Sequence, residues 1–249
     1  MPRVARLDCE SKIHHITARG VGRRIIFEDD VDRVYLYNTI AKLLDELDVD
    51  LYAWCFMRNH IHLLARGEVQ DISKLMQRMT TSYSMHFNGR HGHAGHVFQS
   101  RFGSKPVADD NQFLITLCYI HQNPIRSKER CDYSFKWSSY LEYTNPEIKT
   151  LCNTSFALDM LGGIEDFVRM HDSLLGLSSV SLSNYHVRLN DAEAQRLIEE
   201  LVGPDYGTAL ALMPKPERDA KIRTLRSRNI SIRQIERLTG IGRNIIQRA

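Results

Sequence analysis

The sequence has little cysteine and no long apolar run. Its five cysteines among 249 residues lie far apart and form no C-x-x-C pair, so neither a disulfide framework nor a cysteine zinc site is indicated. No stretch reaches the ~18 consecutive apolar residues of a membrane helix, and the first residues lack the apolar core of a signal peptide. Internal repeats and low-complexity tracts are also missing. We therefore expect a cytoplasmic globular protein with reduced thiols and no membrane partner.

Acidic residues are scarce in one part of the chain. Residues 214–249 contain ten basic and three acidic side chains, a net charge of +7, whereas the whole chain carries +3. Arginine and lysine neutralise phosphates and release their counterions. Within this block the predicted helices 231–238 and 243–248 flank a glycine-containing turn, which is typical of a helix-turn-helix. We therefore favour a nucleic-acid partner over a merely solvated helix face.

The first 126 residues alternate between two hydrophobic periods. β-prone and apolar runs predict strands, and apolar stripes at i, i+3, i+4 and i+7 predict amphipathic helices. We expect Asn88 and Gly89 to end the second helix and Pro124 to end the third. The β-α-β-β-α-β order predicts an α+β, ferredoxin-like sandwich with an antiparallel sheet, followed by an all-α region. In chain order the predicted elements are strand 13–18, helix 30–47, strands 51–57 and 60–66, helix 72–87, strand 97–107 and helix 113–122.

The triplet His60-Ile61-His62 carries the clearest chemical signal. Residues two apart in a strand project to the same face, so both imidazoles point one way while Ile61 packs on the other side. Two histidines so placed supply two nitrogen ligands to a divalent metal without distorting the backbone. The alternative is a pair of polar residues on an exposed strand face.

The third predicted helix supplies a nucleophile candidate. On a helical wheel Tyr119 lies on the more polar face, and the amide of Asn123 lies one turn further on, beside its hydroxyl. Because Asn123 precedes Pro124, we expect it to mark the helix end, with Gln122 as the substitute ligand if Asn123 points away. The alternative for Tyr119 is a half-buried packing tyrosine.

These residues belong to an ordered set of motifs that resembles the HUH single-tyrosine transposases, in particular their REP-associated branch. The resemblance covers about residues 3–145. It implies a metal-dependent DNA strand transferase on a ferredoxin-like fold, with Mg²⁺ or Mn²⁺ as cofactor. By position, His60 and His62 match the metal-binding pair, Tyr119 the nucleophile and Asn123 the third ligand. The motifs read MRNHIHLL (57–64), GHVFQSRF (95–102), YIHQNPIR (119–126) and WSSY (137–140).

The resemblance implies that Tyr119 attacks the phosphorus of one phosphodiester and becomes covalently linked to it. A tyrosine hydroxyl is a poor nucleophile at neutral pH, and a divalent metal compensates by neutralising charge on the phosphate. Attack leaves a 5′-phosphotyrosine and frees a 3′ hydroxyl, so religation needs no nucleotide cofactor. We expect single-stranded, hairpin or palindromic repeat DNA as substrate in DNA transposition. A homodimer, and the use of Tyr119 in its own or a partner's site, are left open.

The three histidines of residues 91–96 lie in a predicted glycine-rich loop. We expect this loop to be solvated or to contact phosphate rather than to bind a metal ion.

The remaining expectations concern alternative functions, domain boundaries and DNA contacts. A catalytically idle DNA-binding regulator is the alternative function, and a zinc hydrolase lacks an evident carboxylate. We expect a catalytic domain at 1–130, an extension of irregular and short helical structure at 131–186, and a basic helical region at 187–249. Candidate DNA contacts are Arg3, Arg6, Arg19, Arg101, Arg126, Arg233 and Arg243.

Overall fold

The computed structural model describes residues 10–127, 132–175, 191–228, 230 and 232–249. Its contacts divide the chain into two compact units, Met1–Ser183 and Asn184–Ala249, and each unit is described by itself. In these described ranges no helix is long and apolar enough to cross a membrane.

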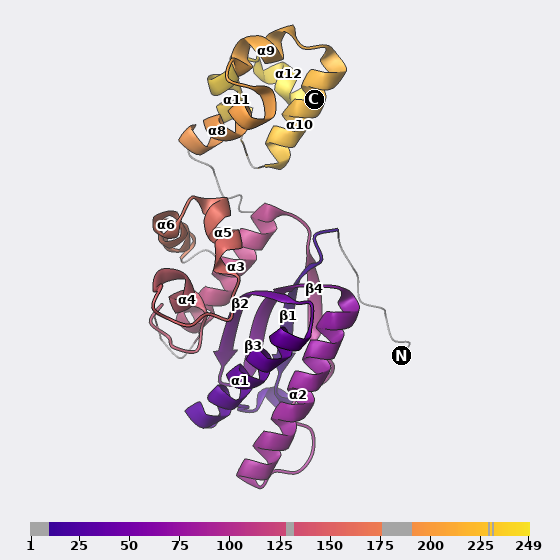
Figure 1. The fold of residues 1–249 in the computed structure, drawn as a ribbon, viewed down its shortest axis with the longest axis vertical. Coiled ribbons are helices and arrows are strands. Elements are labelled where there is room, and N and C mark those ends of the chain that lie inside the picture. Colours follow the sequence, from indigo (N-terminus) through magenta and orange to yellow (C-terminus); the bar gives the residue numbers. More distant parts are fainter. Residues whose placement is uncertain (1–9, 128–131, 176–190, 229, 231) are drawn as a thin grey trace. The chain divides into compact units, whose positions relative to one another are not determined.

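The first unit is built on a four-stranded antiparallel sheet (Figure 1). Its spatial order is β2-β3-β1-β4, with every neighbouring pair antiparallel. The chain order, with one helix between β1 and β2 and one between β3 and β4, confirms the predicted ferredoxin-like α+β fold. The strands are β1 (Ile13–Arg19), β2 (Asp50–Met57), β3 (His60–Arg66) and β4 (Gly103–Val107).

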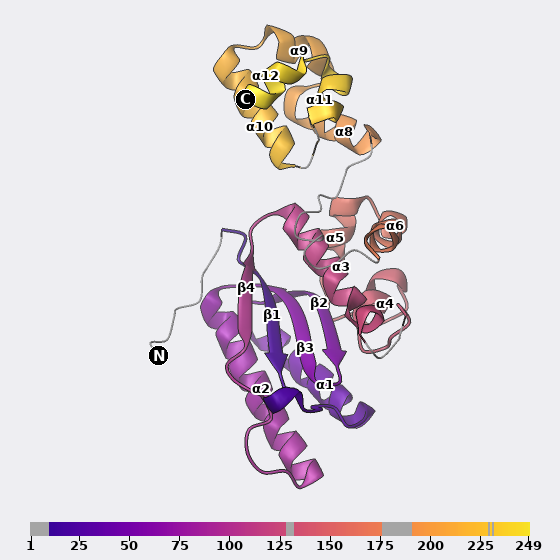
Figure 2. The same ribbon diagram turned by 180° about the vertical axis from the view of Figure 1, so that it is seen from behind.

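Helices cover both faces of this sheet. The helices α1 (Asp30–Glu46) and α2 (Val69–His91) pack together on one face, where Trp54 of β2 contacts Tyr37 of α1. The helix α3 (Asp110–Arg126) packs against β2 and β3 from the other face, where Tyr119 contacts His62 of β3. Trp54 and His62 lie on opposite faces because alternate strand residues point to opposite sides. Figure 2 shows the sheet from the side on which α3 covers only one edge.

Several element boundaries differ from the sequence prediction. The last strand begins at Gly103 rather than at residue 97, because 97–102 form a loop in which Gln99 N–H donates to the Arg19 carbonyl at 2.8 Å. The second helix continues through Gly89 to His91 and ends at Gly92, whose φ of 59° is the left-handed conformation that glycine adopts without strain. Pro124 lies inside the last turn of α3 rather than beyond its end.

The segment that follows α3 completes the first unit at the edge of β2. Residues 137–139 pair with this edge: Phe56 N–H donates to the Trp137 carbonyl at 2.9 Å and Ser139 N–H to the Trp54 carbonyl at 3.0 Å. The added segment covers backbone groups that an edge strand would otherwise expose. The helices α4 (Tyr140–Thr144), α5 (Thr154–Leu161) and α6 (Ile164–Leu174) follow, and all three belong to the first unit.

Two buried histidines join α3 to this added segment. His171 Nδ1 bonds to the carbonyl of Phe167 at 2.8 Å, so it must donate, and in the neutral ring its Nε2 accepts. His121 Nδ1 therefore donates to His171 Nε2 at 2.9 Å, and His121 Nε2 accepts from Ser139 Oγ at 2.8 Å. This directed chain is the one that two neutral rings form. Burial accordingly lowers the pKa of His171 to about 4 and that of His121 well below its ordinary value.

We expect the first unit to lose stability as the pH falls from about 6.5 to about 4. In this range the unfolded chain binds protons that folded His171 and His121 cannot, so the free energy of unfolding falls by about 1.4 kcal/mol per pH unit for each such histidine. Urea denaturation followed by tryptophan fluorescence measures this unit alone, because Trp54 and Trp137 are the only tryptophans of the chain. The variant H171Q should show a shallower pH dependence, and an equal slope would contradict the assignment.

The second unit consists of short helices around an aliphatic core. The helix α8 (Asp191–Val202) is followed by α9 (Tyr206–Leu212), α10 (Lys215–Ser227), α11 (Ile232–Thr239) and α12 (Arg243–Arg248). Every helix contributes to the core, which includes Ala194, Ile198, Leu210, Ile222, Leu225, Ile235 and Ile246. The all-α region that the sequence predicts is therefore present, and α9 is an additional helix that its pattern did not indicate.

Candidate active site

The register of the sheet gathers polar side chains on the face that α3 leaves partly open. His62 of β3 lies opposite Thr17 of β1, and His60 lies opposite Arg19. On the other side of β1, Lys105 of β4 lies opposite His15. Directly paired residues share a face, and residues two apart share it as well. Two predicted metal ligands and three further polar side chains from β1 therefore converge at one place.

A pocket of about 540 Å³ opens at this place and contains the three central residues of the sequence prediction. The rings of His60 and His62 lie 4.9 Å apart between centroids, and the ring of Tyr119 lies 5.7 Å from that of His62. Arg19 and Arg101, predicted as DNA contacts, also line it. The full lining is His15, Thr17, Arg19, His60, His62, Gln99, Ser100, Arg101, Gly103, Ser104, Lys105 and Tyr119.

Hydrogen bonds fix the orientation of His60. Asn59 Nδ2 donates to the carbonyl of Arg23 at 3.2 Å, so Asn59 Oδ1 is the atom that faces His60 Nδ1, at 2.6 Å. An amide oxygen can only accept, and His60 Nδ1 therefore carries the proton. Among the described residues His60 Nε2 has no hydrogen-bond partner, and it keeps its lone pair. This is the protonation state that a metal-ligating imidazole requires.

His15 is a site residue that the sequence prediction missed. Its Nε2 bonds to His62 Nδ1 at 2.9 Å, and the two rings stack with centroids 5.2 Å apart. When His62 Nδ1 donates in this bond, His62 Nε2 carries a lone pair. The ring of His15 also meets Tyr119 edge-on, at 5.7 Å between centroids. His15 therefore contacts both a predicted ligand and the predicted nucleophile.

All three pocket imidazoles are held neutral. Burial, with a smaller contribution from Arg19, lowers the pKa of His60 to about 4. Burial, with Lys105, lowers the pKa of His15 to about 4, and burial together with the neighbouring histidines lowers that of His62 well below its ordinary value. Neutral imidazole is the form that binds a metal ion, so at pH 7 this pair needs to release no proton from its ligand nitrogens.

The helix α3 presents Tyr119 from a half-buried stripe. Gln112, Thr116, Tyr119 and Asn123 recur at helical spacing and are each at least partly exposed, whereas their neighbours are mostly buried. Asn123 is helical, not displaced by the following proline, and its Nδ2 donates to the Tyr119 carbonyl at 2.8 Å. It does not belong to the residues that line the pocket.

Gln122 and Arg126 hold α3 in place instead of reaching the pocket. Gln122 is fully buried, and its Nε2 donates to the carbonyl of His171 at 2.8 Å. Its Oε1 accepts from Arg126 at 2.6 Å, and Arg126 also donates to the carbonyl of Leu174 at 3.2 Å. The structure therefore does not bring Gln122 to the histidine pair as a substitute ligand, and Arg126 joins α3 to α6 rather than lining this pocket.

The second histidine group, in the loop that follows α2, is dispersed. His91 bonds to the Asp32 carboxylate at 3.0 Å, His93 pairs with Arg24, and His96 lines a different pocket. Across the described ranges, no group of three or more His, Cys, Asp or Glu side chains is arranged to hold a metal ion. The three histidines of this loop therefore have separate partners in the structure.

The remaining predicted arginines lie elsewhere in the chain. Arg3 and Arg6 lie outside the described residues, as does the side chain of Arg233. Arg243 is exposed at the start of α12. In the pocket around the histidine pair the cationic side chains are Arg19, Arg101 and Lys105, and none of the described lining residues is acidic. This charge suits a polyanionic ligand.

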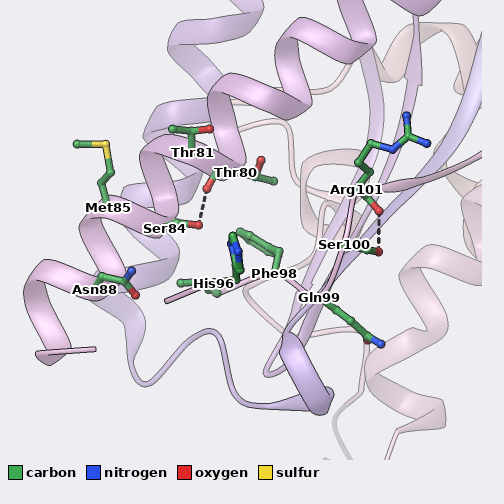
Figure 3. Close-up of a pocket in the computed structure, with 11 residues that line it drawn as sticks. Thr80, Thr81, Ser84, Met85, Asn88, His96, Phe98, Gln99, Ser100 and Arg101 are labelled. Atoms are coloured by element: carbon green, nitrogen blue, oxygen red, sulfur yellow. Dashed lines mark hydrogen bonds between the residues drawn. The ribbon is translucent and has the colours of Figure 1, made fainter. Parts of the chain in front are cut away.

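A second pocket, of about 560 Å³, adjoins the first one (Figure 3). It lies between α2 and the loop 96–101 and shares Gln99, Ser100 and Arg101 with the catalytic pocket. Its α2 wall consists mainly of hydroxyl and amide side chains, with the exposed thioether of Met85 at the rim. The two pockets form a polar surface on both sides of one loop. The wall residues from α2 are Thr80, Thr81, Ser84, Met85 and Asn88.

Comparison with known proteins finds a family model that matches the first part of the chain. Residues 9–123 match the family described as "Transposase IS200 like". The chain is also similar to a solved structure described as "Structure of the REP associates tyrosine transposase bound to a REP hairpin", with 15% sequence identity, a TM-score of 0.49, and coverage of 61% of this chain and 90% of that chain. No curated protein matches the chain. The matched segment, residues 9–123, holds the histidine pair and Tyr119 and is similar to the IS200-like transposases.

Proposed function

We propose that this protein is a metal-dependent single-stranded DNA endonuclease and strand transferase that forms a 5′-phosphotyrosine intermediate at Tyr119. The observation that carries the proposal is the convergence of Tyr119, His60 and His62 on one pocket, where the ring centroid of His62 lies 4.9 Å from that of His60 and 5.7 Å from that of Tyr119. A cationic rim without carboxylates suits a phosphodiester. The match of residues 9–123 to a family of transposases supports a role in DNA transposition.

In this proposal the chain's own residues bind, orient and attack the phosphate. Arg19, Arg101 and Lys105 hold the strand through its phosphate oxygens. The Tyr119 oxygen forms a bond to phosphorus while the bond from phosphorus to the 3′ oxygen breaks. The 3′ oxygen leaves as a hydroxyl with the proton that the tyrosine loses. The bond energy stays in the phosphotyrosine, so a 3′ hydroxyl of another strand can reverse the reaction and complete the transfer.

The residues present fit a divalent metal in two of three expected ligands. His60 and His62 would hold Mg²⁺ or Mn²⁺ through Nε2, because their Nδ1 atoms are already hydrogen-bonded to Asn59 and His15. When bound, the ion would neutralise negative charge that develops on the phosphate. Asn123 remains the proposed third ligand through Oδ1, since its Nδ2 is the atom that donates to the Tyr119 carbonyl.

The proposed nucleophile and the proposed metal-binding histidines lie together within one chain. Tyr119 on α3 contacts His62 and His15 of its own sheet. We therefore propose that Tyr119 acts in the site of its own subunit, whether or not the protein forms a homodimer.

The second pocket, on the other side of the loop 96–101, offers a place for nucleotides that flank the cleaved bond.

The direct test is incubation with an end-labelled single-stranded DNA hairpin and Mg²⁺, followed by a denaturing gel. The proposal requires a labelled band that migrates with the protein and disappears after protease treatment. A cleaved strand without a protein adduct would indicate hydrolysis by water instead of attack by tyrosine. Duplex DNA of the same sequence serves as the control substrate and should give no adduct.

The alternative function is a catalytically idle DNA-binding regulator that keeps the transposase fold. It predicts hairpin binding without any adduct under the same conditions. The pocket argues against it, because neutral, oriented imidazoles beside a half-buried tyrosine have no purpose in binding alone. A zinc hydrolase is the weaker alternative, since none of the described lining residues supplies a carboxylate.

We expect His15 to act as a positioning residue for His62. The variant H15L removes the acceptor at 2.9 Å from His62 Nδ1, so the concentration of Mn²⁺ or Mg²⁺ that gives half-maximal cleavage should rise about 10- to 100-fold. The DNA concentration for half-maximal rate should change little, and H15Q should restore part of the metal affinity through its amide oxygen. The control H93A alters a histidine outside the pocket. Equal metal dependence of H15L and the wild type would contradict this role.

A further inference from the structure

The last helix of the second unit is divided into two chemically distinct faces. At about 100° per residue, four polar side chains of α12 fall within an arc of about 140°: Arg243, Gln247, Asn244 and Arg248. All four side chains are exposed. Ile246, on the opposite side, is fully buried in the core of the unit. The exposed face thus carries two guanidinium groups and two amides, with no acidic side chain.

Neighbouring helices hold this face in a fixed orientation. The turn between α11 and α12 runs through Gly240, whose φ of 73° is left-handed, and places Ile241 in the core. Glu236 of α11 accepts from Arg243 N–H at 3.2 Å, so the nearest carboxylate is used at the start of α12. Arg226 of α10 donates to the Ile246 carbonyl at 3.4 Å, near the other end. The helix therefore projects its polar face outward from two supporting helices.

These side chains have the chemistry that reads base pairs in a major groove. Arginine pairs with two acceptors on guanine, and asparagine and glutamine pair with the donor and acceptor of adenine. The second helix after a short turn is the one that enters the groove in helix-turn-helix proteins, with its first residues at the base edges. Arg243, Asn244 and Gln247 lie in the first five residues of α12.

The aromatic composition of this unit separates duplex from single-stranded DNA. Proteins that bind single strands stack bases on exposed aromatic rings. Between Asp191 and Ala249 the sequence has no Phe or Trp and one Tyr, Tyr206, which packs against the aliphatic core. The unit therefore offers no stacking surface among its described residues. Its exposed polar face instead matches the groove of a regular duplex.

We propose that the second unit binds double-stranded DNA with α12 in the major groove, and that Arg243, Asn244 and Gln247 read its bases. This binding site is separate from the catalytic pocket and does not depend on the strand-transfer chemistry proposed above. It would give the protein two DNA sites of different kinds, one for a single strand and one for a duplex.

The test uses the full chain and begins with selection from a pool of random-sequence duplexes. We expect a recurrent duplex sequence to be enriched and to bind at least tenfold more tightly than its separated strands in fluorescence anisotropy. The double variant N244A/Q247A should lose about tenfold or more for the selected duplex, while a shuffled duplex is bound as before. R248A should weaken binding to all duplexes and make the salt dependence shallower.

The matched control is Q195A/R196A, which removes one amide and one guanidinium from exposed positions of α8 in the same unit. Thermal unfolding should be unchanged in every variant, because all altered side chains are exposed. The proposal is overturned if no duplex sequence is enriched, if single strands bind as tightly, or if N244A/Q247A binds the selected duplex like the control. Cleavage of the hairpin, measured in parallel, should be the same in N244A/Q247A as in the wild type, so failure of the catalytic proposal is scored separately.

Discussion

The variant Y119F should form no covalent adduct with a DNA hairpin and still bind it. The substitution removes one oxygen, the only atom that the proposed mechanism attaches to phosphorus. Tyr119 contacts His15 and His62 through its ring, which phenylalanine retains. We therefore expect cleavage to fall by about 10³-fold or more, with hairpin affinity within about twofold of the wild type. A denaturing gel measures the first quantity and fluorescence anisotropy the second.

The control for this variant is Y37F, because Tyr37 of α1 lies on the other face of the sheet and bonds to the Lys149 carbonyl. It should form the adduct normally. Adduct formation by Y119F at undiminished yield would show that a different residue attacks the phosphate. A mixture of Y119F with a variant that lacks the histidine pair should also be inactive if each chain uses its own tyrosine, and restored cleavage would show exchange between subunits.

The spacing of apolar residues was sufficient to predict most helices and strands of the first unit, because each of them buries one stripe or one face in the core. The stripe from Leu36 to Leu43 is buried against the sheet, as its spacing requires. The ends of these helices and strands depend on contacts with distant parts of the chain, which the spacing of apolar residues does not reveal. Residues 97–102 were predicted to belong to the last strand, but in the structure this segment forms an isolated β-bridge between Phe98 and Gly20. The helix α2 runs through Gly89 because the left-handed position that ends it falls at Gly92.

The site was predictable where its residues share one element and less so where the sheet register brings them together. Period two was sufficient to place His60 and His62 on one face. His15 escaped notice because its contact with His62 follows from the pairing of β1 with β3, and the only local signal was a second histidine in a predicted strand. The contacts of Gln122 could not be predicted for a similar reason, because its partner His171 lies on α6.

Removal of both histidines of the pair should abolish cleavage and most of the metal binding. In H60A/H62A two of the three proposed protein ligands are lost, so the affinity for Mn²⁺ should fall by more than about 100-fold. Cleavage in Mg²⁺ should then fall to the level that the wild type shows in a chelator. Isothermal titration with Mn²⁺ measures the binding, and the hairpin gel measures cleavage. Because His62 is nearly fully buried, thermal unfolding must confirm that the variant folds.

The control is H93A, which removes a histidine from the loop after α2 that lines neither of the two pockets. Its Mn²⁺ affinity and hairpin cleavage should equal those of the wild type. A single variant, H60A, guards against misfolding of the double variant, because His60 is less buried than His62 and its Nδ1 bonds only to Asn59. It should retain the fold and still need far more metal for cleavage. If the wild type cleaves as fast in a chelator as in Mg²⁺, the pair does not hold a catalytic metal, and the imidazoles must act on the phosphate directly.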